Sequence, residues 1–294
     1  MDSSNLTKRV EAIKDGYRSE ATFFTEYKKH FPSMSVCVQL IYDIRTLLFP
    51  GYFDKESPAG MSSDTLVAQR LLHIEHVLSR QVFKALLFQD ADQCPPVVQA
   101  KAEEITAAFL DELPKVQSLL LKDIHAAFDG DPAARSLEEI LVCYPGFFAI
   151  FTHRVAHELF LLDVPLIPRL MSEHAHSKSG IDIGPGAQIG EYFFIDHGTG
   201  VVIGETTVIG SHAKIYQGVT LGATSTRKGQ LLSGVKRHPT LGDYVTVYSN
   251  ASILGGDTFI GDGAVIGGSV FVCESVPANA RVGMKEQELN ITVR

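Results

Sequence analysis

Aliphatic residues recur at every sixth position along most of the last third of the chain. Each is usually followed by glycine and then by small residues, as in the consecutive segments IGETTV, IGSHAK and IYQGVT that begin at Ile203. A six-residue repeat of this composition is typical of a parallel β-helix, in which short strands stack into triangular coils. About seventeen such units predict a solenoid of roughly five to six coils, which starts near Ile181.

Apart from a slip of one residue near Leu254, the six-residue rhythm fails at two places. After Ile195 the next aliphatic position, Ile203, arrives two residues late, behind the polar segment Asp196-His197-Gly198-Thr199-Gly200. Between Leu221 and Leu241 the rhythm lapses altogether, which predicts a loop that projects from the solenoid. Because a solenoid is a rigid scaffold and loops often carry function, we expect the chemistry of the protein at these two breaks.

The first part of the chain follows a helical period instead. A helix is predicted behind the N-cap candidates Ser62-Ser63-Asp64, and a second from Val97 towards Leu110, ended or restarted at Pro114. Turns are expected at residues 49–51 and 57–60. The first of these helices carries a single apolar stripe, formed by Val67, Leu71, Ile74, Leu78 and Leu86.

A further helix is predicted from Leu137 to Leu162, interrupted at Pro145-Gly146. The change from a helical period to a six-residue period divides the chain. The sequence therefore predicts an α+β protein with an α-helical N-terminal domain at residues 1–178. A β-helix of hexapeptide repeats follows at residues 179–294, interrupted by the loop 223–237.

Composition restricts the partners and the compartment. The formal net charge of −8 argues against nucleic acid and anionic membranes as partners. No apolar run approaches the length of about 20 residues that spans a bilayer, and the polar N-terminus does not resemble a signal peptide. The four cysteines are scattered without a C-x-x-C pair, which indicates reduced thiols. We therefore expect a cytoplasmic protein.

Several motifs around the first break together resemble a known family. They read D-I-x-P-x-A-x-I-G at 182–190, D-H-x-T-G-x-V-x-G-E-T at 196–206 and Q-x-V-T-L-G at 217–222, with R-H-P at 237–239. Asp131-Pro132-Ala133 and Gly146-Phe147 extend the match into the helical half. This combination is similar to serine O-acetyltransferases, hexapeptide-repeat enzymes that make O-acetylserine for cysteine biosynthesis. The resemblance implies a left-handed parallel β-helix, acetyl-CoA as donor and L-serine as acceptor.

The resemblance assigns a general base to the first break. Acetyl transfer to an alcohol requires a group that accepts the hydroxyl proton, and a neutral imidazole oriented by a carboxylate suits this step. By position in the family, His197 is the base and Asp182 the carboxylate that orients it. The two residues lie 15 apart in sequence, about one coil, and residues one coil apart are expected to stack.

The substrates would occupy residues from both breaks. A serine zwitterion needs an anion for its ammonium group and a cation for its carboxylate. The family pattern implies Asp131 and Asp196 at the amine and hydroxyl, Arg237 at the carboxylate, and His238 at the substrate or at the oxyanion of the tetrahedral intermediate. The acetyl-CoA arm is expected between coils, as a co-substrate and not a tightly bound cofactor. By family position its contacts are Gly222, Ala223, Ser249 and Gly268.

Partners implied by the resemblance are further copies of the chain and small molecules. A homotrimer or a dimer of trimers is expected, and L-cysteine would act as a feedback inhibitor that shares the serine residues. Family members that bind O-acetylserine sulfhydrylase use a tail ending in isoleucine, whereas this sequence ends in Arg294, so we do not expect that complex. The loop 223–237 is longer than the family's glycine-rich loop and can reshape the site.

Other functions remain as alternatives. One alternative is another hexapeptide-repeat acyltransferase, which would act on a homoserine, an amino sugar or another small alcohol. A γ-class carbonic anhydrase would need three zinc histidines, for which His197, His212 and His238 are the candidates. A non-catalytic scaffold leaves the D-H-x-T-G and R-H-P motifs unexplained. The pairs His153/His157 and His174/His176 have spacings that metals use, but we expect no metal site there.

Overall fold

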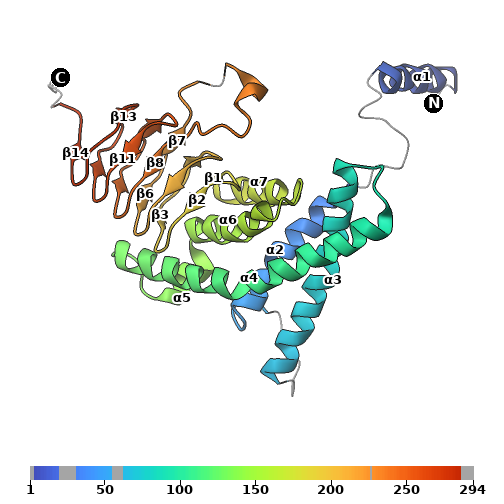
Figure 1. Cartoon of the computed structure of the whole chain (residues 1–294), viewed down its shortest axis with the longest axis horizontal. Coiled ribbons are helices and arrows are strands. Elements are labelled where there is room, and N and C mark those ends of the chain that lie inside the picture. Colours follow the sequence, from blue (N-terminus) through green and yellow to red (C-terminus); the bar gives the residue numbers. More distant parts are fainter. Residues whose placement is uncertain (1–2, 20–30, 55–61, 226, 286–294) are drawn as a thin grey trace.

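The computed structural model describes residues 3–19, 31–54, 62–225 and 227–285, in which seven helices precede a parallel β-solenoid (Figure 1). The predicted turn at 57–60 and the terminal Arg294 lie outside these ranges. The helices are α1 (Ser3–Ser19), α2 (Met34–Leu48), α3 (Ser63–Gln89), α4 (Pro95–Gly130), α5 (Leu137–Cys143), α6 (Pro145–Leu161) and α7 (Ile167–Ser179).

From β1 to β13 every third strand of the solenoid belongs to the same parallel sheet, and β14 joins the third sheet beside β12, which confirms the predicted fold class. Face A consists of β1 (Asp182–Ile183), β4 (Val202–Ile203), β7 (Thr220–Gly222), β10 (Ser252–Leu254) and β13 (Phe271–Val272). Face B consists of β2 (Gln188–Ile189), β5 (Val208–Ile209), β8 (Thr240–Leu241) and β11 (Phe259–Ile260). Face C consists of β3 (Phe194–Asp196), β6 (Lys214–Tyr216), β9 (Thr246–Val247), β12 (Val265–Ile266) and β14 (Arg281–Val282).

The chain turns at three corners of each coil, which we name the AB, BC and CA corners after the faces that they join. The aliphatic residue of each repeat points inward, and the stacked residues of face A, Ile183, Ile203, Leu221 and Ile253, are all buried. This inward column explains the six-residue period, because each face contributes one buried position per coil.

The register of the strands locates both breaks. Ile183 pairs with Ile203, and Ile203 pairs with Leu221, so the first coil contains 20 residues and the next contains 18. The two additional residues lie at the CA corner that carries His197. The second break, between β7 and β8, leaves the solenoid at an AB corner and includes a short 3₁₀ helix at Gly229–Leu232.

The helical predictions are confirmed at several ends and wrong at one proline. Ser62 caps α3 by accepting a hydrogen bond from the Thr65 amide, and Tyr144 separates α5 from α6 at Pro145. In contrast, α4 continues through Pro114 from Pro95 to Gly130. Pro114 removes one backbone donor, but Leu113 and Val116 on either side of it are buried. Tertiary packing therefore overrides the local preference for a break.

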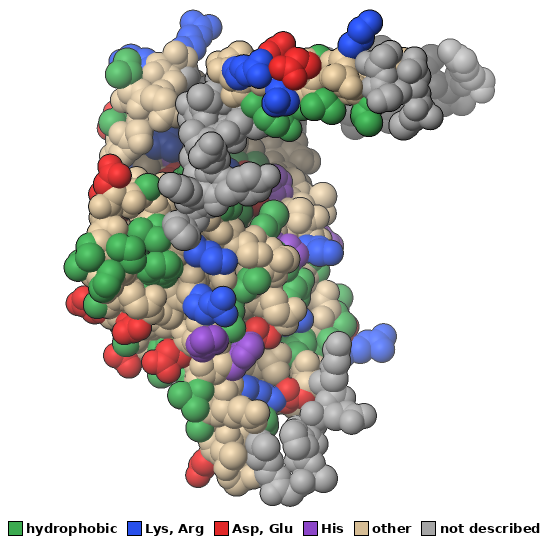
Figure 2. Space-filling view, turned by 90° about the vertical axis from the view of Figure 1, so that its right-hand side faces the viewer, with side chains coloured by type: hydrophobic (Ala, Val, Ile, Leu, Met, Phe, Trp, Pro, Cys, Tyr) green, Lys and Arg blue, Asp and Glu red, His purple; other side chains and the backbone are tan. Residues whose placement is uncertain are grey.

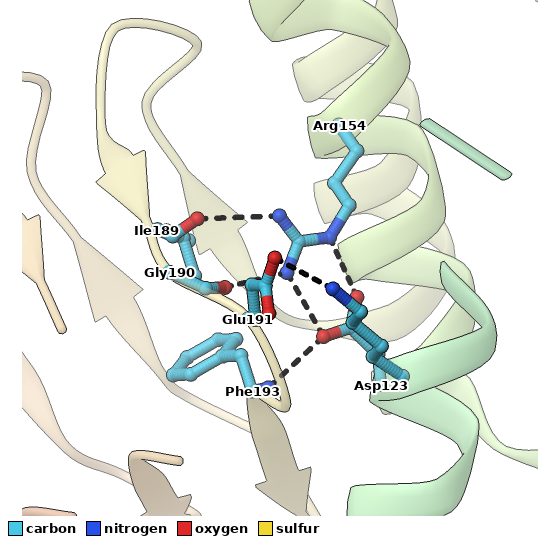
Figure 3. Close-up of polar contacts among 7 residues, drawn as sticks. Asp123, Arg154, Ile189, Gly190, Glu191 and Phe193 are labelled. Atoms are coloured by element: carbon cyan, nitrogen blue, oxygen red, sulfur yellow. Dashed lines mark hydrogen bonds and ion pairs between the residues drawn. The ribbon is translucent and has the colours of Figure 1, made fainter. Parts of the chain in front are cut away.

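The helices dock on the first coil through an interlocked core and a buried ion pair. Phe194 of β3 packs into the helical core, whereas Ala149 and Ile150 of α6 pack into the solenoid core. Beside them Arg154 of α6 binds Asp123 of α4 and reaches the solenoid backbone (Figure 3). The change of secondary structure lies between Ser179 and Asp182, but side-chain packing crosses it.

The surface of the N-terminal helices is mixed in character. Seen from that end, positive and negative side chains are interspersed with apolar ones (Figure 2). Such a surface differs from the concentrated basic patch that binds nucleic acid. None of the described helices is long and apolar enough to cross a membrane.

Candidate active site

His197 occupies the corner at which the solenoid departs from its rhythm. It follows β3 at the CA corner, and its backbone lies in the left-handed region with φ +58°. Few non-glycine residues adopt this region, and His, Asn and Asp are the ones enriched in it. The imidazole points outward, with 73% of the side chain exposed, so a small molecule can reach the ring.

Two carboxylates and a lysine lie near His197, where α4 ends against β3. Asp196 Oδ1 is 3.9 Å from His197 Nε2, and Asp196 Oδ2 is 3.4 Å from Lys214 Nζ of β6. Lys214 Nζ also donates a 2.5 Å hydrogen bond to the carbonyl of Gly130, the last residue of α4. Asp131, the next residue along the chain, is thereby held near Asp196.

Asp131 is held as a carboxylate by its surroundings. The Tyr144 hydroxyl donates a 2.6 Å hydrogen bond to Asp131 Oδ2, and the Ala133 amide donates one of 2.8 Å to Oδ1. The Tyr144 bond, followed by the Ala133 amide and the charges of Lys214 and His197, lowers the pKa of Asp131. The same bond raises the pKa of Tyr144 to about 12. Asp131 is therefore anionic at neutral pH, as a group that binds an ammonium must be.

Asp182 is near the His197 turn but does not bind the imidazole. Gly200 of that turn donates a backbone hydrogen bond to Gly180, and Asp182 donates one to Val201. The expectation that residues 182 and 197 stack one coil apart is wrong, because the first coil contains 20 residues and Val202 stacks on Asp182. Within the described ranges, the carboxylate nearest to the imidazole is that of Asp196.

His238 lies at the AB corner, where the long loop returns to the solenoid. Only 8% of the residue is exposed, and its ring packs on the backbone of Gly204, where a Cβ atom would lie 2.1 Å from Cδ2. The Thr206 amide donates a 3.1 Å hydrogen bond to Nδ1. Since Nδ1 accepts this bond, the proton of the neutral ring is on Nε2.

The environment of His238 keeps the ring neutral. Burial, and then the neighbouring charges of Arg237 and Lys236, lower the pKa of His238 to about 4. A ring that is neutral at physiological pH, with its proton on Nε2, is a hydrogen-bond donor but no source of positive charge. This state fits the expected role of a donor to a substrate oxygen.

Arg237 borders a cavity of about 840 Å³ between the loop, helix α7 and the first coils. Its guanidinium donates hydrogen bonds only to carbonyls of its own loop, those of Leu232 and Val235, among the residues described. Arg169 and Lys236 line the same cavity, together with Glu205. A guanidinium without a carboxylate partner at the edge of a cavity can bind an anionic group.

The predicted donor-binding residues divide between the same two corners. Ser249 and Gly268 lie one above the other at the CA corner, where a Cβ atom on Gly268 would meet Ser249 O at 3.2 Å. Gly222 ends β7 and Ala223 begins the long loop at the AB corner. The residues predicted to bind acetyl-CoA and those predicted to bind serine are thus both divided between the CA and AB corners. One chain does not bring the residues of its CA corner together with those of its AB corner.

The remaining histidines occupy other places. His212 lies at the BC corner, stacked between Tyr192 and Tyr244 at centroid distances of 4.4 and 4.5 Å. The three histidines considered for zinc therefore lie at three different corners of the coils. His153 is buried and stacks on His157, and the described part of the chain contains no group of three or more metal-ligating side chains.

Tyr144 and Lys214 belong to the site although no motif of the sequence contains them. Tyr144 precedes a proline at the start of a helix, where nothing in the local pattern marks it as a partner of Asp131. Lys214 occupies an outward-facing position of a hexapeptide, which looks like any solvated lysine until the end of α4 is placed over it. The aligned segment Asp131-Pro132-Ala133 was the one signal that pointed to this place.

Comparison with known proteins decides the family. The family model described as the N-terminal region of serine acetyltransferase matches residues 60–152. A plasmid-encoded serine acetyltransferase of Synechococcus elongatus is 43% identical over 263 residues, which cover 87% of this chain and 82% of that protein. The chain belongs to the serine acetyltransferase family. It is thus an acetyltransferase. The serine acetyltransferase of Bacillus subtilis is also similar, with 46% identity over 54% of this chain and 70% of its own length.

Solved serine acetyltransferases share the fold. Isoform 3 of Entamoeba histolytica, solved in complex with cysteine, superimposes with a TM-score of 0.73 at 35% identity, over 87% of this chain and 84% of its own. The Neisseria gonorrhoeae enzyme, solved in complex with serine, gives a TM-score of 0.56 at 28% identity, over 85% of this chain and 97% of its own. Both matches span the helical region and the solenoid.

Proposed function

We propose that the protein transfers the acetyl group of acetyl-CoA to the hydroxyl of L-serine, giving O-acetylserine and CoA. The observation that carries the proposal is the exposed imidazole of His197 beside Asp131 and Asp196, in a chain of the serine acetyltransferase family. Binding of serine by the N. gonorrhoeae relative supports serine as the acceptor. Binding of cysteine by an E. histolytica relative supports cysteine as an inhibitor that competes for the same residues.

The chemistry assigns one proton to His197. Its neutral imidazole accepts the serine hydroxyl proton while the oxygen attacks the thioester carbonyl. Collapse of the tetrahedral intermediate breaks the carbon–sulfur bond, and the imidazolium returns the proton to the CoA thiolate. The Nε2–H of His238 donates to the developing oxyanion or to the substrate.

The zwitterion of serine is bound by opposite charges. Asp131 and Asp196 take the ammonium group, and Arg237 takes the carboxylate. Asp182 stays the proposed orienting carboxylate, since its strand is bonded to the turn that follows His197. Asp196 is the competing partner, being the carboxylate that the imidazole faces at 3.9 Å.

The complete site is proposed to form between copies of the chain. His197, Asp196 and Ser249 belong to the CA side of the solenoid, whereas Arg237, His238 and Gly222 belong to the AB side. A triangular solenoid surrounded by identical copies can place the CA corner of one against the AB corner of the next, which closes into a ring by three-fold symmetry. The acetyl-CoA arm would lie in the groove between the two corners, and a closed trimer would complete every site.

The activity is tested by following the release of CoA from acetyl-CoA. We expect release that depends on L-serine and is slower with homoserine, with an amino sugar and without an acceptor. L-Cysteine should raise the apparent KM for serine if it occupies the same residues. Release that is independent of serine, or faster with another acceptor, would contradict the proposed substrate.

The shared site is tested by mixing two inactive variants. His197→Asn impairs the CA corner and Arg237→Met impairs the AB corner, so neither variant alone should turn over serine efficiently. Random mixing in trimers restores about a quarter of the sites, those in which both facing corners are intact. Co-expressed variants should therefore recover activity that the separately purified variants lack. Absence of recovery would place all these residues in a site within one copy.

A further inference from the structure

Lys214 lies outside all the family motifs, but it connects Asp131 and Asp196, the two carboxylates proposed to bind the serine ammonium. Lys214 projects from the outer side of β6, and its Nζ lies over the rings of Phe194 and Tyr216, 4.9 and 4.7 Å from the two centroids. Only 22% of the side chain is exposed. The ammonium is thus held by two cation–π contacts at the junction between α4 and β3.

The two acceptors of the ammonium come from different parts of the chain. Lys214 Nζ is 2.5 Å from the carbonyl of Gly130 and 3.4 Å from Asp196 Oδ2. The last carbonyls of a helix lack intrahelical donors and carry the negative end of the helix dipole. A cation at this place therefore stabilises the end of α4 and ties it to the strand that bears Asp196.

The helix end can approach this closely because residue 130 is glycine. A Cβ atom there would lie 2.8 Å from the Phe194 ring and 3.6 Å from Lys214 Nζ. Asp131 follows directly, so the position of the helix end determines the position of the Asp131 carboxylate. Holding Gly130 against β3 thereby fixes the spacing between Asp131 and Asp196.

The charges of the site also require a cation. Two aspartates, which are ordinarily ionised at neutral pH, carry one more negative charge than a single ammonium group balances. Lys214 reduces their net charge to −1, which matches the single positive charge of an amino group. Among the described residues, the other titratable groups facing this place include His197, Tyr144 at the start of α6, Glu139 of α5 and Tyr216 of β6.

We propose that Lys214 is a positioning residue for the acceptor site, which clamps the end of α4 to β3 and leaves Asp131 and Asp196 with one net negative charge. The inference rests on the proposed function, since it concerns the binding of the serine ammonium. Lys214 itself need not touch the substrate.

The test compares Lys214→Met with Lys214→Arg and with a control lysine. Lys122 also connects α4 to the solenoid, through a 2.6 Å ion pair with Glu191, and lies away from Asp131 and Asp196. We expect Lys214→Met to raise KM for serine about tenfold or more, because Asp131 and Asp196 lose the cation that holds them in place for the ammonium. KM for acetyl-CoA should stay within about twofold, and Lys214→Arg should recover most of the affinity because it retains the charge.

The two kinetic constants separate a positioning role from general destabilisation. Lys214→Met should raise KM for serine and leave kcat at saturating serine close to the wild-type value, because His197 keeps its place at the CA corner. Lys122→Met should leave both constants unchanged. An unchanged KM for serine in Lys214→Met, or an equal change in Lys122→Met, would overturn the inference. If the wild-type protein lacks serine-dependent CoA release, the proposed function itself has failed.

Discussion

The His197→Asn variant should lose about 10²- to 10⁴-fold of kcat, the range expected when a general base is removed. Asparagine is the appropriate replacement because the backbone of His197 is left-handed, at φ +58°, and Asn adopts that region more easily than alanine does. The side chain is largely exposed, so its removal should leave the unfolding midpoint unchanged. Steady-state release of CoA, measured at saturating serine and acetyl-CoA, gives the loss directly.

A comparison of neighbouring variants identifies the carboxylate that acts with His197. If Asp182 orients the imidazole, Asp182→Asn should lower kcat with little change in KM for serine. If Asp196 acts on the imidazole as well as on the amine, Asp196→Asn should change both constants.

Retention of near-wild-type kcat by His197→Asn would show that another group accepts the proton. A loss of folded protein in circular dichroism would leave the assignment of His197 as the base unsupported.

Sequence periodicity could predict the solenoid because its cause is local. Each repeat must bury one aliphatic side chain, such as Ile203 or Leu221, and each departure from the period is a change in chain length at one corner. That is why His197 and the loop 223–237 could both be located before the fold was known. Family motifs then supplied the roles that a period alone does not contain.

Contacts that depend on three-dimensional placement could not be predicted in the same way. The prediction that Asp182 stacks on His197 was wrong because two extra residues lengthen the first coil, so that Asp182 pairs with Val202. The number of residues at a corner determines which residues of successive coils stack. Pro114 suggested a helix end by a local rule, but buried neighbours keep α4 continuous. Lys214 became part of the site only through the end of α4, which lies far from it in sequence.

The buried pair Asp123 and Arg154 is the feature whose disruption should destabilise the fold most. The two side chains are 0% and 5% exposed, and the guanidinium donates bonds of 2.6 and 2.9 Å to the two carboxylate oxygens. Arg154 also donates to the carbonyls of Ile189 and Gly190, while Asp123 Oδ1 accepts a bond from the Phe193 amide (Figure 3). One ion pair therefore joins α4, α6 and the first coil, next to the strand that bears Asp196.

Removing either partner should lower the free energy of unfolding by about 3–5 kcal/mol, because it leaves the other charge buried without compensation. Far-UV circular dichroism in a urea titration is the suitable measurement, since the chain contains no tryptophan. All variants should be compared at one protein concentration, because assembly couples stability to concentration. The partly exposed pair Lys122–Glu191 links the same helix to the same coil, and Lys122→Met should cost at most about 1 kcal/mol.

The double variant Asp123→Asn/Arg154→Met tests whether the penalty arises from the unpaired charge. Removing both partners leaves no buried charge, so the double variant should be more stable than the sum of the two single losses predicts. Burial raises the pKa of Asp123, against the opposing effects of Arg154 and the Phe193 amide. In Arg154→Met the effect of burial on the pKa of Asp123 is less opposed. The Asp123 carboxyl therefore keeps its proton in the folded state, whereas it loses this proton in the unfolded chain above a pH of about 4. The penalty of Arg154→Met should therefore grow as the pH rises from that value, whereas that of Asp123→Asn should not. Additive losses that are independent of pH would show that the pair contributes only packing.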